Sequence, residues 1–129
     1  MAEEKRPEGI QLHTRSRELE LSYPGGESYR LPCEYLRVYS PSAEVQGHGP
    51  GQEVLQSGKL KVAITAIKPV GHYALQLVFD DGHDTGLYSW TYLYQLCRER
   101  EQRWRDYLKR LEQAGLSRDP DVQVINFQH

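Results

Sequence analysis

Two histidines are the first candidates for chemistry in this sequence. His83 follows Asp80-Asp81-Gly82, and His48 lies within the glycine-rich run 47–51. Imidazole and carboxylate groups are ligands of Zn²⁺ and Fe²⁺, so these histidines, with Asp81 or Asp84, are candidate metal ligands. However, the chain has no Cys-x-x-Cys pair and no His-x-Asp element with a matched distal histidine. The spacing alone therefore favours ordinary loop and hairpin residues over a metal centre.

The two cysteines are the candidate nucleophiles. Cys33 starts one predicted helix and Cys97 falls on the apolar stripe of another, and neither lies in a nucleophile motif. A Gly-x-Ser-x-Gly elbow is also missing from the sequence. The glycine run 47–51 lacks the Gly-Lys-Ser/Thr ending of a phosphate-binding loop, which favours a flexible connection. We therefore expect no catalytic residue and no bound cofactor.

Composition narrows the class of protein further. The chain has 129 residues, 38% of them hydrophobic, with 16 basic and 18 acidic side chains and a net charge of -2. This balance predicts no binding to nucleic acid or to anionic lipid. The sequence has only two cysteines, no apolar run of membrane-spanning length and no apolar signal segment at its start. These features together predict a single cytoplasmic domain.

Hydropathy patterns predict the elements that would position these residues. Alternation of apolar and polar residues predicts short strands around 10–12, 19–21, 28–31, 62–67, 73–79 and 84–88, with turns at 23–27 and 80–82. Pro32 begins a predicted short helix over 33–39. From Trp90 to Leu111 the spacing is helical, with Ser89 as the expected N-cap and Gly115 as the stop.

The predicted fold class is therefore α+β: a small antiparallel β-rich domain with one short helix and a long C-terminal amphipathic helix. Residues 1–8 are predicted to form a disordered N-terminus, 9–115 the domain, and 116–129 a C-terminal tail that is either disordered or an edge strand. On the long helix, the residues expected to face the core are Leu93, Tyr94, Cys97, Tyr107 and Leu108. The loop 40–59 is long for so small a domain, and loops of this length are usually functional or disordered.

Two motifs link the sequence to a known family. The segments LPCEYLRVYSPSAEVQGHG (31–49) and FDDGHDTGLYSWTYLYQL (79–96) resemble the gamma-butyrobetaine hydroxylase-like N-terminal domain. The resemblance covers about residues 9–100. In the carnitine-biosynthesis dioxygenases, that domain precedes a catalytic domain that holds Fe²⁺ and 2-oxoglutarate. It carries a structural zinc bound by three cysteines and one histidine.

The resemblance places the zinc-binding histidine at His83 and the cysteines at Ser40, Ser42 and Val45. Zinc requires thiolate or imidazole ligands, and neutral serine hydroxyls are poor substitutes. We therefore expect that neither zinc nor iron binds here. Because the matching region is only the non-catalytic domain, we also expect no hydroxylase activity.

Similar domains occur alone in bacteria and fused to a scaffold ATPase of iron–sulfur cluster assembly. The resemblance thus implies a non-catalytic interaction or accessory module that assists iron–sulfur or other metalloprotein maturation, with another protein as its partner. We expect the loop 40–58 to lie beside the segment 82–89, with an interaction surface made by Ser40, Ser42, His48, His83 and Tyr88. The alternatives are a metal-binding protein or small enzyme that uses His48 and His83, and a dioxygenase-related domain that helps a partner enzyme dimerise.

Overall fold

Two antiparallel three-stranded sheets form the β part of the computed structural model, which describes residues 5–122. The first sheet has the order β1-β2-β3 and the second the order β4-β5-β6. Their bounds are Gly9–His13 (β1), Glu18–Ser22 (β2), Ser28–Pro32 (β3), Ile64–Val70 (β4), Ala74–Phe79 (β5) and Leu87–Ser89 (β6). Period-two alternation turns Leu19, Leu21 and Leu31 to the buried face of the first sheet, as the sequence predicts.

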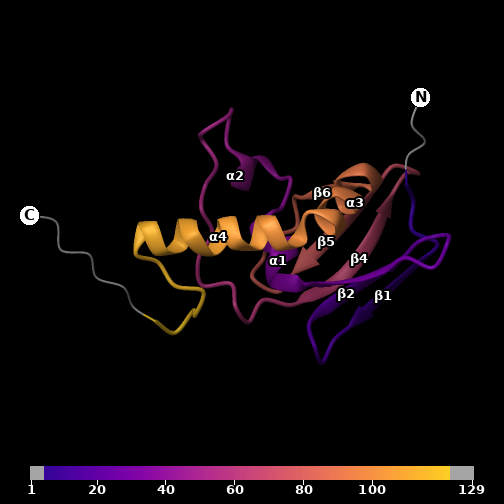
Figure 1. The fold of residues 1–129 in the computed structure, drawn as a ribbon, viewed down its shortest axis with the longest axis horizontal. Helices are drawn as coiled ribbons and strands as arrows, with labels where there is room; N and C mark the ends of the chain where they lie inside the picture. The colour runs from indigo at the N-terminus through magenta and orange to yellow at the C-terminus, as the bar shows by residue number, and fades with distance from the viewer. Residues whose placement is uncertain (1–4, 123–129) are drawn as a thin grey trace, which may run out of the picture.

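Four helices are present in the described part of the chain (Figure 1). They are α1 (Cys33–Val38), α2 (Ala43–Gln46), α3 (Trp90–Arg98) and α4 (Arg100–Ala114). The short helix α1 follows Pro32 directly, and all of its residues are buried. Helix α4 passes α1 and projects away from the two sheets, while α2 lies on a segment that rises from the body beside α4 (Figure 1).

The main core lies where the two sheets and α3 meet. Its buried members are mostly leucine and aromatic residues, including Leu19, Leu31, Leu77, Phe79, Tyr88, Leu93 and Leu96. Tyr35 ties α1 to this core, because its hydroxyl donates to the carbonyl of Leu96 over 2.7 Å. A second, smaller core of Val38, Tyr107 and Leu111 joins α4 to α1. Helix α4 is thus held by one apolar side and exposes the rest.

The predicted long C-terminal helix is two helices, which corrects the sequence interpretation. Glu99 separates α3 from α4 with φ −103° and ψ 16°. The N–H of Glu99 donates to the carbonyl of Gln95, and the N–H of Arg103 donates to the carbonyl of Glu99. The two helices therefore follow one another with their backbone hydrogen bonds maintained on both sides of Glu99. Leu93, Cys97 and Tyr107 are buried as expected and Tyr94 is half-buried against the main core, but Leu108 is 38% exposed. The prediction for Leu108 was wrong because α4 packs on α1 through Tyr107 and Leu111, and Leu108 lies outside that contact.

Both terminal segments are partly tied to the domain. The backbone N–H of Glu8 donates to the carbonyl of Ser22 over 2.7 Å, which extends the pairing of β1 and β2. Residues 116–122 return to the body, where the N–H groups of Gly58 and Leu60 donate to the carbonyls of Ser117 and Arg118. Of the N-terminus expected to be disordered (1–8) and the expected tail (116–129), residues 1–4 and 123–129 lie outside the described residues.

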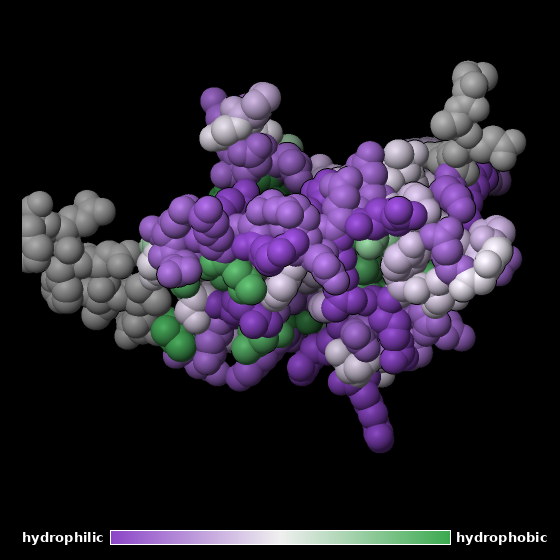
Figure 2. Space-filling view, viewed as in Figure 1, coloured by the Kyte–Doolittle hydropathy of each residue, from purple (hydrophilic) through white to green (hydrophobic). Residues whose placement is uncertain are grey.

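Most of the surface in view is polar, with apolar side chains exposed beneath α4 (Figure 2). A hollow there is lined by leucines, among them Leu60, Leu108 and Leu116. No helix of the described chain has the length and apolarity needed to cross a bilayer.

Candidate functional site

A cluster of polar side chains joins the loop after α1 to the hairpin between β5 and β6. We call it the Ser40–His83 cluster; its members are Ser40, Ser42, Glu44, His83 and Thr85. The Ser40 Oγ lies 2.8 Å from the His83 Nε2, and the Ser42 Oγ lies 2.7 Å from the Thr85 Oγ1. The Thr85 hydroxyl also donates to the Glu44 carboxylate over 3.1 Å. The expected contact between these two segments is therefore confirmed.

The hairpin turn places His83 inside the protein. Gly82 has φ +89°, which a side chain would disfavour, and the N–H of Phe79 donates to the carbonyl of His83 over 2.9 Å. The Asp81 carboxylate accepts from Arg37 Nε, from Lys59 Nζ and from the His83 backbone N–H. Burial acts to raise the pKa of Asp81, but these donors and the Arg37 charge outweigh it and bring the pKa to about 2. The turn is thus fixed by an ionised carboxylate.

Short-range structure places the serines on the other side of the cluster. Ser42 caps α2, since its hydroxyl accepts from the N–H of Glu44 over 3.2 Å. The backbone at Gly86 packs directly on Ser40, and a Cβ at that position would overlap the Ser40 Oγ. A residue without a side chain is therefore required where the hairpin crosses the loop.

Ser40, His83 and Glu44 are the side-chain types of a hydrolytic triad, but they cannot act as one. The His83 Nδ1 lies 3.3 Å from the Glu44 Oε2 but makes no hydrogen bond with it. Ser40 is 0% exposed and His83 is 5% exposed, so no substrate carbonyl reaches the serine. Burial, with the charge of Arg37, lowers the pKa of His83 and keeps the ring neutral at pH 7.

The residues at the expected zinc positions do not fit the metal. Only His83 offers a strong donor, because the Ser40 and Ser42 hydroxyls are neutral and Val45 is a buried aliphatic side chain. Across residues 5–122, no group of three or more His, Cys, Asp or Glu side chains converges as a metal site would need. His48 lies in the exposed turn after α2, and no described hydrogen bond joins it to the cluster.

The cysteines have the structural role that their positions indicate. Cys33 and Cys97 are free and buried. Burial raises the pKa of both thiols, that of Cys97 to about 11. Neither is therefore a reactive thiolate at neutral pH.

The predicted interaction surface needs correction, because four of its five side chains are buried. Ser40, Ser42, His83 and Tyr88 are between 0% and 6% exposed, and only His48 is exposed. The Tyr88 hydroxyl donates to the carbonyl of Leu36 over 2.5 Å. These side chains hold the loop in place and cannot themselves contact a partner.

A groove that the sequence did not predict lies between this loop and α4. We call it the Val54 groove; its volume is about 540 Å³. Its lining mixes apolar and aromatic residues with polar and charged ones, and polar atoms make up the larger part of its surface: Val38, Tyr39, Pro41, Val45, Val54 and Tyr92 next to Gln46, Glu53, Arg103 and Arg110. The guanidinium of Arg103 lies 5.2 Å from the ring centre of Tyr39 and 5.6 Å from that of Tyr92. The sequence carries no signal for this groove, because aromatic residues at helical spacing are typical of a core.

Comparisons with known proteins agree with this fold. The family model for "Gamma-butyrobetaine hydroxylase-like, N-terminal" matches residues 10–94. One similar NMR solution structure is 54% identical, covers 98% of this chain and 100% of its own, and superposes with a TM-score of 0.82. A second NMR structure is 48% identical over 100% of this chain and 98% of its own, with a TM-score of 0.77.

A third similar structure is a crystal structure from Acidithiobacillus ferrooxidans, described as a protein of unknown function in the DUF971 family. It is 38% identical, covers 70% of this chain and 91% of its own, and has a TM-score of 0.59. Among curated proteins no match was found. The family match spans about two-thirds of the residues and contains the first motif, all but the last two residues of the second, the Ser40–His83 cluster and both sheets apart from Gly9. The chain belongs to the gamma-butyrobetaine hydroxylase-like N-terminal family.

Proposed function

We propose that this chain is a non-catalytic accessory module that binds another protein and assists the maturation of iron–sulfur or other metalloproteins. The observation that carries the binding role is the Val54 groove, a hollow of mixed polar and apolar lining beside an anchored, protruding loop with an exposed valine. The maturation role is supported by the resemblance to domains that are fused to a scaffold ATPase of iron–sulfur cluster assembly.

The loop presents an apolar side chain in a fixed position. Val54 is 53% exposed at the edge of the groove, and its backbone N–H donates to the carbonyl of Val45 over 2.8 Å. Val45 itself is the buried residue of α2, the helix that Ser42 caps. A rigid apolar group beside a hollow loses little conformational entropy on binding, which favours docking of a partner.

The charged groups at the groove favour a specific partner over non-specific adhesion. Arg103 and Arg110 line one side on α4, and Glu53 lines the other side on the loop. Charges of both signs at the edge of an apolar surface set the register of an interface more than they add affinity. The non-catalytic part of the proposal is supported by the burial of Ser40 and His83, the one arrangement that resembles catalytic machinery.

The test is affinity purification from the native cell with three forms of the tagged chain: wild type, Val54→Glu and Tyr73→Glu. Tyr73 is 57% exposed in the turn between β4 and β5 and does not line the groove, so it is a matched control for charge and exposure. We expect a protein that is captured by wild type and Tyr73→Glu and is lost with Val54→Glu. Equal capture by all three forms would contradict the groove as the binding surface.

The maturation role is tested separately. Mass spectrometry identifies the captured protein, and its iron content is measured after purification from cells that carry wild type or Val54→Glu as their only copy. We expect a lower metal occupancy with Val54→Glu and no change with Tyr73→Glu. A captured partner that holds no metal centre, or whose metal content does not change, would refute the maturation role and leave the binding role standing.

A further inference from the structure

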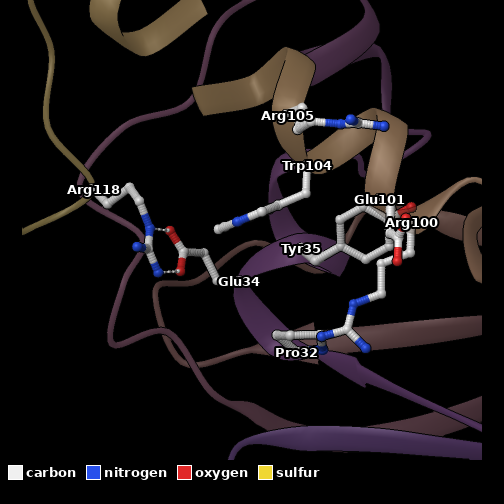
Figure 3. A pocket seen from close by; sticks show the side chains of 8 residues that line it. All are labelled: Pro32, Glu34, Tyr35, Arg100, Glu101, Trp104, Arg105 and Arg118. Carbon is white, nitrogen blue, oxygen red and sulfur yellow. Dashed lines mark hydrogen bonds and ion pairs between the residues drawn. The ribbon is translucent and has the colours of Figure 1, made fainter. Parts of the chain in front are cut away.

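A second hollow lies on the other side of α4, where the helix faces α1 and the end of β3 (Figure 3). We call it the Trp104 cleft; its volume is about 430 Å³. It combines aromatic or cyclic side chains with arginines: Pro32, Tyr35, Trp104, Arg100, Arg105 and Arg118. None of these residues belongs to the Val54 groove or to the Ser40–His83 cluster.

One end of the cleft is built around a buried ion pair. The guanidinium of Arg118 donates to both oxygens of Glu34, over 2.8 and 2.7 Å, and Glu34 is 5% exposed. The same guanidinium lies 5.0 Å from the ring centre of Trp104. Figure 3 shows this pair beside the indole, with the nitrogen-bearing edge of the ring turned toward it. A bidentate pair of this kind fixes the wall of the cleft before any ligand arrives.

The aromatic groups offer a surface with one unused donor. The hydroxyl of Tyr35 is engaged by the Leu96 carbonyl, so the phenol is held in place. Trp104 is half-buried, and within residues 5–122 its indole N–H has no hydrogen-bond acceptor. The other tryptophan differs, because the Trp90 indole donates to the carbonyl of His72 over 2.7 Å. The indole N–H of Trp104 is therefore available to donate to a ligand, whereas that of Trp90 is already engaged.

The unpaired charge in the cleft is positive. In the described part of the chain Arg105 makes no hydrogen bond or ion pair, and Arg100 uses one nitrogen on the carbonyl of Arg30, over 2.7 Å. Glu101 is the one acid at the cleft besides the neutralised Glu34. Two arginines against one glutamate favour an anionic ligand, and guanidinium groups bind carboxylates in a bidentate geometry.

The shape favours an extended ligand. A neighbouring hollow of about 420 Å³ shares Arg100, Glu101 and Arg105 with the cleft and adds Arg98 and Glu99 among its charged residues. Because the two hollows share these residues at the start of α4, an extended ligand can contact both. A peptide segment offers both a side chain to lie against an aromatic ring and carboxylates spaced along its length.

From these features we infer that the Trp104 cleft binds an acidic peptide segment of a partner protein. An aromatic or aliphatic side chain of the peptide packs against Trp104 and Tyr35, and its carboxylates pair with Arg100 and Arg105. This site is separate from the Val54 groove, so it stands or falls independently of the proposed function.

The test follows the two indole N–H resonances of the ¹⁵N-labelled chain by NMR while blocked peptides are added. The probe is Asp-Glu-Phe-Asp-Glu; its controls are Asn-Gln-Phe-Asn-Gln, which lacks charge, and Asp-Glu-Ala-Asp-Glu, which lacks the ring. We expect saturable binding of the probe below about 1 mM, with a shift of the Trp104 indole resonance and none at Trp90. Each control peptide is expected to bind at least about fivefold more weakly.

Arg105→Glu and Lys109→Glu provide the matched pair of variants, since both residues are exposed on α4 and both changes alter the net charge equally. We expect Arg105→Glu to weaken binding of the probe at least about fivefold and Lys109→Glu less than about twofold. Equal weakening by both variants, equal binding of the three peptides or no saturation overturns the inference. A change in solution mass with Arg105→Glu would show that a second copy of this chain occupies the cleft, which also overturns it.

Discussion

The Ser40–His83 cluster and the Trp104 cleft both contain polar and charged side chains, but they differ in how many of these groups lack a hydrogen-bond partner. Each joins segments that are far apart in the chain: 43 residues between Ser40 and His83, and 84 between Glu34 and Arg118. In the cluster, hydroxyl, imidazole and carboxylate groups largely serve one another inside the protein. In the cleft, the Arg105 guanidinium and the Trp104 indole N–H have no hydrogen-bond acceptor among the described residues, although the indole ring itself packs on Arg118, Tyr35 and Tyr107.

The difference shows that residue type alone does not indicate function. Serine, histidine and glutamate are the types associated with catalysis, yet here burial assigns them to holding a loop against a hairpin. Arginine and tryptophan on an amphipathic helix are typical of a solvated face and a core. Here their position at a hollow leaves them with unused binding capacity. Four measurements test this contrast, from the largest expected effect to the smallest.

His83→Ala is expected to have the largest effect. It removes a buried ring that packs 6.0 Å from the Phe79 ring centre, and it leaves the Ser40 hydroxyl with the Ser42 backbone N–H but without its side-chain partner. Lost packing and an unsatisfied buried group together predict a loss of about 3 kcal/mol in the free energy of unfolding. Chemical denaturation measures it, and amide resonances of residues 40–47 are expected to shift. Unchanged stability and unchanged loop resonances would mean that the cluster does not hold the loop.

Gly86→Ala tests the tight packing of the same cluster without removing any polar group. The added methyl group would overlap the Ser40 Oγ and lie 3.3 Å from both Pro41 Cδ and Tyr88 Cε1. Because Ser40 and Tyr88 are fully buried, neither can move into solvent, and we expect a loss of about 2 kcal/mol. Gly49→Ala provides a control for the backbone, since nothing lies within 4 Å of its Cβ position and its φ is not positive. An equal loss of stability in both variants would show that close packing of Gly86 on Ser40 is not the cause.

The pH dependence of stability is expected to be smaller. Burial lowers the pKa of His83 in the folded state, so below about pH 6.5 the unfolded chain takes up a proton that the folded chain does not. Stability therefore falls as the pH falls from about 6.5 toward the folded-state pKa, by at most about 1.4 kcal/mol per pH unit. Above about pH 6.5, His83 is neutral in both the folded and the unfolded chain, and it no longer changes the stability with pH.

Denaturation between pH 5.0 and 7.5 measures this slope above the range where Asp81 and Glu27, whose pKa values lie near 2, begin to titrate. His83→Gln is the control and is expected to flatten the profile. A wild-type slope that persists in His83→Gln would assign the effect to another group.

Arg105→Ala is expected to have the smallest effect on stability, within about 0.5 kcal/mol of wild type. The side chain is exposed and makes no interaction with the described residues, so the folded state loses nothing when it is removed. Thermal melts of wild type, Arg105→Ala and His83→Ala under the same conditions measure this difference in stability. A loss above about 1 kcal/mol would show that Arg105 is part of the fold and would weaken the contrast between cluster and cleft.

Much of the fold was predictable because local patterns decide it. Strict alternation located the strands, Asp-Gly located the β5–β6 turn, and Pro32 located the start of α1. Helix α2 was not predicted because a four-residue helix has no hydropathy period, and only the cap at Ser42 marks it. The break at Glu99 has no local signal either, since it serves the docking of Tyr107 on Val38, a contact between distant segments.

The candidate sites were predicted less completely. The contact between Ser40 and His83 followed from the resemblance, but their burial depends on how Gly86 and Tyr88 close over them. The Val54 groove and the Trp104 cleft were both missed, because each is formed by side chains from several separate elements. No single stretch of sequence contains the Trp104 cleft, whose lining extends from Pro32 to Arg118.

The ion pair between Glu34 and Arg118 has a consequence for how the protein is made. Glu34 lies in a helix that is complete early in synthesis, whereas its counterion is 84 residues later. At about 5–20 residues per second, the carboxylate waits several seconds for its partner, and until then Glu34 carries an uncompensated charge at a position that is buried in the folded protein. A fragment cut at the edge of the family match, residue 94, would have neither Trp104 nor Arg118. We therefore expect such a fragment to be less stable than the full chain, because Glu34 would be buried without its counterion.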